Sequence, residues 1–362
     1  MPNRVKKSFF ISIAALTVFA MTGFSSMAQS DSISLAFEKS NLSRESFEND
    51  RPNESLRYML EAHRLDPNNI IYTFESGFLQ YLLKDYKGAI QTMSPYVQHI
   101  DAMPPFFQFL ANAYFMNEQV EEAITLMDIA LSKFPKNGML HLEKGNILAE
   151  RKEPGQALFY YLKGIQAEPN YALNYYKAAM IYFQQNQLAD GILLGETFMN
   201  LERDSPYTEY MSAELMKQYK KSIQINLDSN WTTHFCQMDK PDDTVQRSAL
   251  ENHPAVCQAF AYLVQQCNHD SIFQLDLAQL SALRENMLEL YYLVDLNEVY
   301  GEPIFEFQRV IFEQGHFEAY NHWLMMLGNP EEYSLWKENN TEKWSAFVQW
   351  FNRFQLQFPE NE

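Results

Sequence analysis

The chain has 362 residues, of which 46% are hydrophobic and 15% aromatic, so it can bury a sizeable core and is not a disordered protein. Its 46 acidic and 28 basic residues give a net charge of −18, which disfavours binding to nucleic acid and to anionic lipid surfaces. With 12 glycines and 15 prolines, the composition favours helices over a turn-rich sheet protein.

Residues 1–28 have the three parts of an export signal. The basic residues Arg4, Lys6 and Lys7 precede an apolar run over 9–20, and small residues at Ser26 and Ala28 suit a signal peptidase. As a helix the apolar run would measure roughly 18 Å, which is too short for a bilayer core of about 30 Å. We therefore expect cleavage after Ala28, a mature net charge of −21 and an exported, most simply bacterial periplasmic, location without a stable membrane anchor. A retained anchor is the alternative.

Residues 29–35 are expected to lead into an internal repeat with a period of about 34 residues. Two series of small residues recur at this spacing: Ser43, Gly77, Ala111, Gly145, Ala179 and Ala213, then Ser55, Ala89, Ala123, Ala157 and Gly191. Bulky residues follow four positions after the second series, at Met59, Met93, Met127 and Tyr161, and prolines follow at Pro67, Pro135 and Pro169. Since two stretches of helical spacing flank a polar turn in each unit, the pattern predicts helix pairs that cross closely at the small residues.

This pattern resembles the tetratricopeptide repeat, with units at 36–69, 70–103, 104–137, 138–171 and 172–205 and a partial sixth unit, so that the array covers 36–222. The resemblance implies an all-α fold in which helical hairpins stack into a right-handed superhelical solenoid. Asp101 and Arg203 stand where the family has proline, and Gly195 stands where a large residue belongs. We therefore expect the fifth hairpin to be the loosest.

The last third of the chain is predicted to be helical but out of phase with the repeat. Residues 223–250 are polar and acidic around Pro241 and are predicted to be a linker. Helical patterns after Pro254 predict a C-terminal helical domain over 251–362, in which the hairpin at 303–327, with Gly315 at its turn, resembles a degenerate repeat. The tryptophans Trp323, Trp336, Trp344 and Trp350 are expected in its core. Residues 227–362 carry a net charge of −14, which leaves a basic partner as an alternative to solvated faces.

No catalytic, cofactor or metal motif is present in the sequence. It has no phosphate-binding loop, nucleophile elbow or zinc-protease motif. His316 and His322 are six residues apart and do not share a helix face. Cys257 and Cys267 are predicted on one helix, about 15 Å apart, so a disulfide would involve Cys236, and the absence of any disulfide is equally open. We expect a protein that is not an enzyme and has no cofactor or metal.

The resemblance also implies a partner-binding groove on the first helix of each hairpin. Tetratricopeptide arrays usually bind a peptide or helix of a protein partner on this concave face. The family's groove positions fall on Phe74, Phe78, Tyr81, Asn112, Phe115, Met116, Met139, Asn146, Tyr176, Met180 and Phe183. Asn112 and Asn146, at matching positions, would bond a partner's backbone. Gln108 and Leu142 stand at places where chaperone-binding members carry basic residues.

These observations predict a non-catalytic protein–protein interaction scaffold in the cell envelope. One alternative is a glycan-binding component associated with the outer membrane. Another is an array whose groove is filled by its own helices from 230–362, because a free apolar groove favours unwanted association. The partner and the oligomeric state are left open by the sequence.

Overall fold

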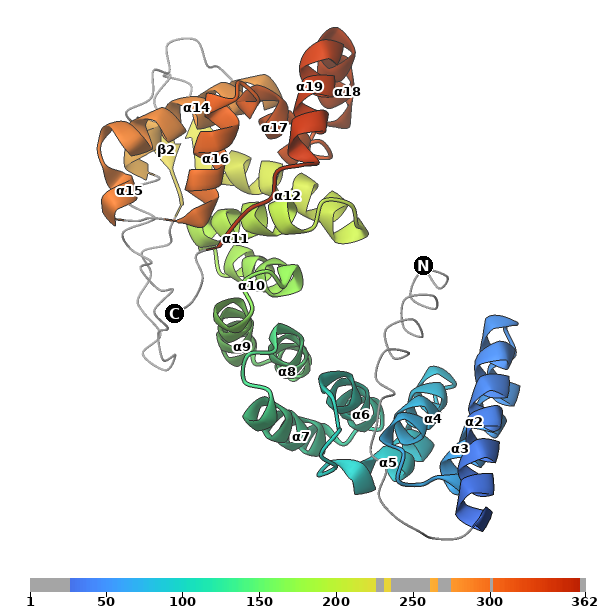
Figure 1. Ribbon diagram of the computed structural model, residues 1–362. Coiled ribbons are helices and arrows are strands. Elements are labelled where there is room, and N and C mark those ends of the chain that lie inside the picture. The colour runs from blue at the N-terminus through green and yellow to red at the C-terminus, as the bar shows by residue number, and fades with distance from the viewer. Residues whose placement is uncertain (1–26, 226–230, 236–260, 266–274, 300–301, 359–362) are drawn as a thin grey trace. The chain divides into compact units, whose positions relative to one another are not determined.

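A computed structural model of the 362-residue chain describes residues 27–225, 231–235, 261–265, 275–299 and 302–358 (Figure 1). Residues 1–26 of the predicted export signal at 1–28, and all three cysteines, lie outside these residues. The chain divides into two compact units, residues 1–134 and 135–362, which are described in turn. The described residues are helical apart from their connections and one short pair of strands, which confirms the all-α prediction.

The first unit contains three helical hairpins. Its elements are α2 (Met27–Glu48), α3 (Pro52–Leu65), α4 (Ile70–Leu82), α5 (Tyr86–Met93), the 3-10 helix η1 (Ser94–Tyr96), α6 (Pro104–Met116) and α7 (Val120–Lys133). Proline in the first turn begins α3 and α6, and the side chains of Asn69 and Asp85 cap α4 and α5. The expected lead-in at 29–35 is part of α2, so that prediction was wrong: the first helix begins before the repeat pattern becomes recognisable.

The second unit continues the array and adds further helices. Its elements are α8 (Gly138–Glu150), α9 (Pro154–Ala167), α10 (Ala172–Gln184), α11 (Leu188–Leu201), α12 (Pro206–Ser222), β1 (Ile223–Ile225), β2 (Trp231–Thr233), α14 (Leu277–Leu293), α15 (Leu296–Val299), α16 (Pro303–Glu313), α17 (Phe317–Leu324), α18 (Pro330–Asn339) and α19 (Thr341–Phe351). Strands β1 and β2 are antiparallel, with Ile223 opposite Thr233. The predicted linker at 223–250 therefore starts with paired backbone, and its remainder from 236 lies outside the described residues.

The small residues lie where the two helices of a hairpin cross, as the repeat pattern predicts. A side chain at Gly77 would overlap Met93, and one at Gly145 would overlap the Tyr161 ring. In the first hairpin the hydroxyl groups of Ser43 and Ser55 are 2.9 Å apart. At Gly77 and Gly145 the small residue thus meets a bulky neighbour on the second helix of its hairpin, which is the close packing that the repeat pattern predicts.

The turn inside each hairpin depends on one residue in the left-handed region of backbone conformation. Asp50, Lys84, Glu118, Lys152 and Asn186 have φ between 56° and 67° and follow one another at the spacing of the repeat. This conformation lets the amide of Glu118 bond the Phe115 carbonyl at 3.0 Å, and that of Gln119 bond the Tyr114 carbonyl at 2.9 Å. The non-glycine residues at these five turns therefore adopt a backbone conformation that costs free energy.

The C-terminal hairpin of α16 and α17 uses the same turn. Gly315 has φ 70°, its amide bonds the Phe312 carbonyl at 2.8 Å, and the next amide bonds the Ile311 carbonyl at 3.0 Å. This supports the interpretation of 303–327 as a degenerate repeat. Counted from the turn, however, the positions of Ala111 and Ala123 are occupied by Gln308 and Tyr320, two large residues that reach other helices.

The C-terminal helices pack on the end of the array within one unit, so the boundary between the two units lies at 134/135 and not at the predicted linker. The expectation that the fifth hairpin is the loosest was wrong. Gly195 on α11 lets α12 approach closely, because a Cβ there would lie 2.8 Å from the Met211 sulfur. Most of α11 is buried, since α12 covers one side of it and α16 also contacts it.

Candidate functional site

Six of the predicted groove residues lie in the first unit, on α4 and α6. Phe74, Phe78 and Tyr81 surround the ring of Phe109, with ring centroids 6.1, 4.8 and 5.6 Å from it. Phe74 and Phe78 are buried and Tyr81 is half-buried. Phe109 was not predicted, because glutamates occupy the matching positions of the neighbouring repeats and the position carries no repeated signal.

The remaining three residues of the first unit offer more surface. Phe115 is half-buried, and Met116, at the end of α6, is 48% exposed. Asn112 is half-buried, and within the described part of the chain its side chain makes no hydrogen bond. We call Tyr81, Phe109, Asn112, Phe115 and Met116 the first-unit surface. It combines apolar side chains with one amide that can both donate and accept.

The other five predicted residues lie in the second unit, on α8 and α10, and their environments differ. Phe183 is 4% exposed and packs against Gly191 at the crossing of the fifth hairpin, so it is a core residue. Asn146 is half-buried, and its Oδ1 accepts a hydrogen bond from the Tyr161 hydroxyl at 3.0 Å. Met139 and Met180 are half-buried. The two asparagines at matching positions are therefore not equivalent.

Tyr176 belongs to an aromatic cluster that the sequence analysis did not identify. Its ring contacts those of Tyr207 and Tyr210 on α12, with centroids 5.0 and 6.4 Å away. These two rings are 46% and 50% exposed. The sequence contained one feature that could have predicted the cluster: Tyr210 lies one repeat period after Tyr176, in the partial sixth unit.

The described C-terminal helices meet the array mainly on α11 and α12. Their hydrogen bonds and ion pairs reach Glu196, Asn200, Arg203, Ser212 and Tyr219, and the ring of Phe358 stacks on Tyr175. Within the described residues, none of these interactions involves the five predicted groove residues of the second unit. The self-filled groove therefore gains no support from this part of the chain.

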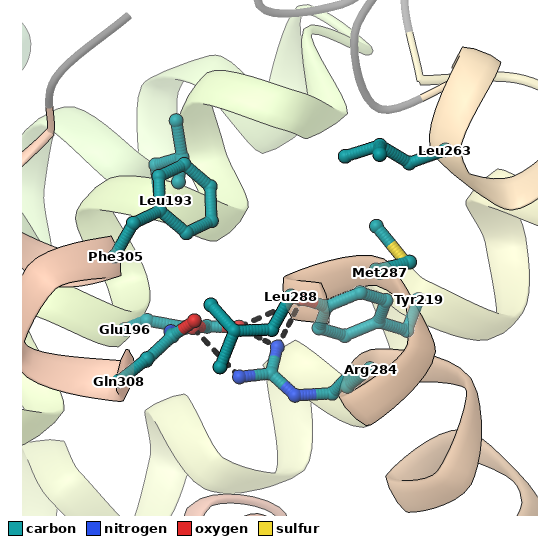
Figure 2. A pocket seen from close by; sticks show the side chains of 9 residues that line it. All are labelled: Leu193, Glu196, Tyr219, Leu263, Arg284, Met287, Leu288, Phe305 and Gln308. Carbon is teal, nitrogen blue, oxygen red and sulfur yellow. Dashed lines mark hydrogen bonds and ion pairs between the residues drawn. The ribbon is translucent and has the colours of Figure 1, made fainter. Parts of the chain in front are cut away.

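A buried ion pair is the centre of this attachment (Figure 2). The guanidinium of Arg284 on α14 binds the carboxylate of Glu196 on α11, with Nη2 and Oε2 2.9 Å apart. The carboxylate also accepts from Tyr219 at 2.7 Å and from Gln308 at 2.6 Å. Arg284 Nε donates to Asn321 at 2.7 Å. Four helices besides α11 therefore contribute to one polar network.

Among the described residues, the network leaves no room for a substrate. Glu196 and Arg284 are almost fully buried, and the adjoining cavity is about 20 Å³, room for a single water molecule. Burial opposes the charge of Arg284, but the Glu196 carboxylate outweighs this effect and raises the pKa of Arg284, so the guanidinium stays charged. Burial also raises the pKa of Tyr219, which keeps its hydroxyl a donor. The Glu196–Arg284 network therefore has a structural role: it attaches the C-terminal helices to α11 and α12.

The two C-terminal histidines are part of aromatic packing. His322 stacks on Trp336 with centroids 4.0 Å apart, and His316 lies 5.4 Å from the Trp350 ring. Burial lowers the pKa of both imidazoles, so they are neutral at pH 7. No group of three His, Cys, Asp or Glu side chains in the described ranges is arranged to hold a metal ion. Of the four C-terminal tryptophans, Trp323 is buried and the others are half-buried, so the core prediction holds fully for one.

Among the helices in the described part of the chain, none combines the length and apolar character needed to span a bilayer.

No family model matches the chain, and no curated protein matches it. Similar solved structures include MamA (TM-score 0.40, 15% identity, 47% of this chain and 92% of that one) and YrrB, described as a TPR protein with an unusual peptide-binding site (0.38, 16%, 50% and 95%). Another is PilF of Pseudomonas aeruginosa (0.44, 12%, 53% and 86%). Each covers about half of this chain, and at these TM-scores the likeness adds nothing to the fold already read from the helices.

Proposed function

We propose that the chain is a non-catalytic scaffold in the cell envelope that binds a peptide or helix of a protein partner on the first helices of its hairpins. The observation that carries this proposal is the apolar surface left on α6 by Phe115 and Met116. Half-exposed apolar side chains beside a polar amide are typical of a protein contact surface rather than of a core.

The first-unit surface has the chemistry needed for such a contact. Burying Met116 and Phe115 against a partner would contribute up to about 1.5–3 kcal/mol each when complete. Asn112 lies between Phe109 and Phe115 in sequence on the same helix, so its amide can pair with a partner's backbone N–H and C=O groups. Apolar anchors with a nearby amide suit a short peptide or one face of a helix.

The second unit offers a separate contact surface at Tyr176, Tyr207 and Tyr210. Tyrosine is enriched at protein contact sites because its ring is large and rigid and its hydroxyl can bond to the partner. Met180, also half-buried on α10, adds apolar area on the same helix as Tyr176. We propose that this cluster contributes to partner binding independently of the first-unit surface.

The experiment is a comparison of two matched double variants in affinity capture from the native envelope. Phe115→Ser with Met116→Ser removes the apolar contact of the first unit, whereas Ile100→Ser with Met103→Ser removes two exposed apolar side chains from the segment before α6. We expect a partner that the wild type and the control variant retain and that the first variant loses, with equal melting temperatures. Retention of every captured protein by all three forms would contradict the proposal.

Export is proposed on the composition of residues 1–28 and is tested separately. N-terminal sequencing of the protein from an envelope fraction should find Gln29 as the first residue. An intact Met1 in that fraction would contradict cleavage after Ala28.

A further inference from the structure

A second candidate site lies in the second unit, in a cleft between the end of α11 and residues 352–358, which follow α19. Its volume is about 560 Å³, within the range of about 300–1,000 Å³ that is usual for small-ligand sites. It does not overlap the first-unit surface or the tyrosine cluster.

Arg203 fixes the shape of the cleft. Its Nε donates to the Asn200 carbonyl at 3.1 Å, its Nη2 donates to the Phe354 carbonyl at 2.8 Å, and its Nη1 donates to the Phe351 carbonyl. The guanidinium also lies 3.7 Å from the centre of the Phe351 ring. These contacts use the guanidinium to bind backbone carbonyls of the protein. Arg203 therefore positions the residues that line the cleft, and its guanidinium is not directed at an anionic ligand.

Among the described residues, the lining is dominated by amides and contains no carboxylate. Of nine lining residues, five are Asn170, Asn200, Asn352, Gln355 and Gln357, and the other four are Leu201, Arg203, Leu356 and Phe358. Each side-chain amide supplies one acceptor oxygen and a donor NH2 group. A neutral ligand whose groups both donate and accept matches such a wall, and hydroxyl groups have this property.

One of these amides is buried with an unused acceptor. Asn200 is 3% exposed, and its Nδ2 donates to the Tyr320 hydroxyl and to the Glu196 carbonyl, each at 2.8 Å. Within the described residues its Oδ1 has no hydrogen-bond partner. This oxygen is also closed to solvent, so Asn200 belongs to the supporting wall of the cleft and not to its accessible surface.

The ring of Phe358 provides an apolar surface in the same cleft. It stacks on Tyr175 with ring centroids 6.1 Å apart and an interplanar angle of 26°, so its position is supported from α10. Apart from this ring and two leucines, the described lining residues offer no apolar group that would receive peptide side chains. Sugar rings, by contrast, have an apolar face as well as hydroxyl groups.

We infer that this cleft binds a neutral oligosaccharide. Exposed Asn170, Asn352 and Gln357 bond its hydroxyls, and Phe358 packs on one sugar face. An anionic glycan is disfavoured because Arg203 is engaged by backbone carbonyls. This site is independent of the proposed scaffold function, and either can fail without the other.

Titration calorimetry on the full mature chain tests the inference with neutral hexasaccharides of glucose, mannose and xylose as probes. At least one should bind the wild type. The double variant Asn352→Ala with Gln357→Ala removes two exposed amides and should weaken that binding about tenfold or more. The matched control is Asn339→Ala with Gln314→Ala, which removes one Asn and one Gln exposed elsewhere in the unit and should bind as the wild type does.

Three results would overturn the inference. The first is no binding of any probe at millimolar concentration. The second is a probe that binds equally to wild type, cleft variant and control, which would place its site elsewhere. The third is a neutral glycine- and serine-rich decapeptide that binds the wild type more tightly than every saccharide and loses affinity in the cleft variant, because the amides would then recognise a peptide backbone.

Discussion

The hydroxyl of Tyr161 on α9 donates a hydrogen bond of 3.0 Å to Oδ1 of Asn146 on α8, across the helix crossing at Gly145. The matching position of the preceding repeat is Met127, which has no hydroxyl, so Asn112 has no equivalent bond. Two asparagines that a repeat alignment treats as equals thus have different roles. Asn146 is bonded across its hairpin, whereas the Asn112 side chain has no such bond across its own.

Replacing the two asparagines separately should therefore give different results. Asn146→Ala leaves the buried Tyr161 hydroxyl without its acceptor and should lower the free energy of unfolding by about 1–2 kcal/mol. Asn112→Ala should change it by less than about 0.5 kcal/mol and weaken partner binding instead. Urea denaturation and a binding titration measure the two effects. Adding Tyr161→Phe to Asn146→Ala should recover part of the loss, and equal stabilities of the single variants would contradict the assignment.

Gly145→Leu should be strongly destabilising, because its side chain would overlap the Tyr161 ring at the helix crossing. Overpacking of this kind costs about 1–3 kcal/mol or more. Thermal unfolding followed by circular dichroism provides the measurement. Ala149→Leu, at an exposed position of the same helix, is the control and should leave the melting temperature nearly unchanged.

Lys152→Gly should stabilise the protein, which is unusual for a glycine substitution next to a helix. Lys152 has φ 67°, and glycine adopts this conformation without the steric cost that an L-residue has. After the loss of backbone entropy is included, we expect a gain of about 0.5–1 kcal/mol. Glu150→Gly, two residues earlier at the end of α8, should destabilise instead. A lower unfolding midpoint for Lys152→Gly would count against the strain at this turn.

Breaking the buried ion pair should be among the most damaging changes in the second unit. Either Glu196→Gln or Arg284→Met leaves a polar or charged partner buried without compensation, with an expected cost of about 3–5 kcal/mol. The double variant should cost less than the sum of the two, which a double-mutant cycle in denaturant would show. The exposed pair of Glu306 and Arg309, 3.0 Å apart, is the control, and Glu306→Gln should cost under about 1 kcal/mol.

Glu75 should make the stability of the first unit depend on pH. Its carboxyl is buried, one oxygen accepts from Arg44 at 3.2 Å, and burial raises its pKa more than Arg44 lowers it. Because the pKa is higher in the folded state than in the unfolded one, the contribution of Glu75 is greatest below about pH 4 and is lost as pH rises through the folded pKa. The stability of the wild type relative to Glu75→Gln should therefore fall from pH 4 to pH 7. Glu45→Gln, at an exposed position of the same unit, is the control for the loss of one carboxylate.

The hairpins, their phase and their crossings could be predicted from the sequence. Each period of the repeat places small and bulky residues at the same positions. A helix crossing is therefore indicated wherever they recur, as at Gly77 with Met93 and at Gly145 with Tyr161. Helix periodicity and proline positions act over a few residues and are visible in one chain. Candidate surface positions such as Met116 follow from the same phase.

The environments of those positions were decided by the tertiary structure. Phe183 is a core residue, Asn146 is bonded to Tyr161, and the tyrosine cluster exists only because α12 packs beside α10. Glu196 and Arg284 are remote in sequence, and no repeated pattern predicts their ion pair. The same is true of the hydrogen bond from Arg203 to the Phe354 carbonyl after α19. Each such contact between distant segments occurs at a single place in the fold and depends on the shape and charge of particular side chains. It therefore produces no repeated pattern in the sequence.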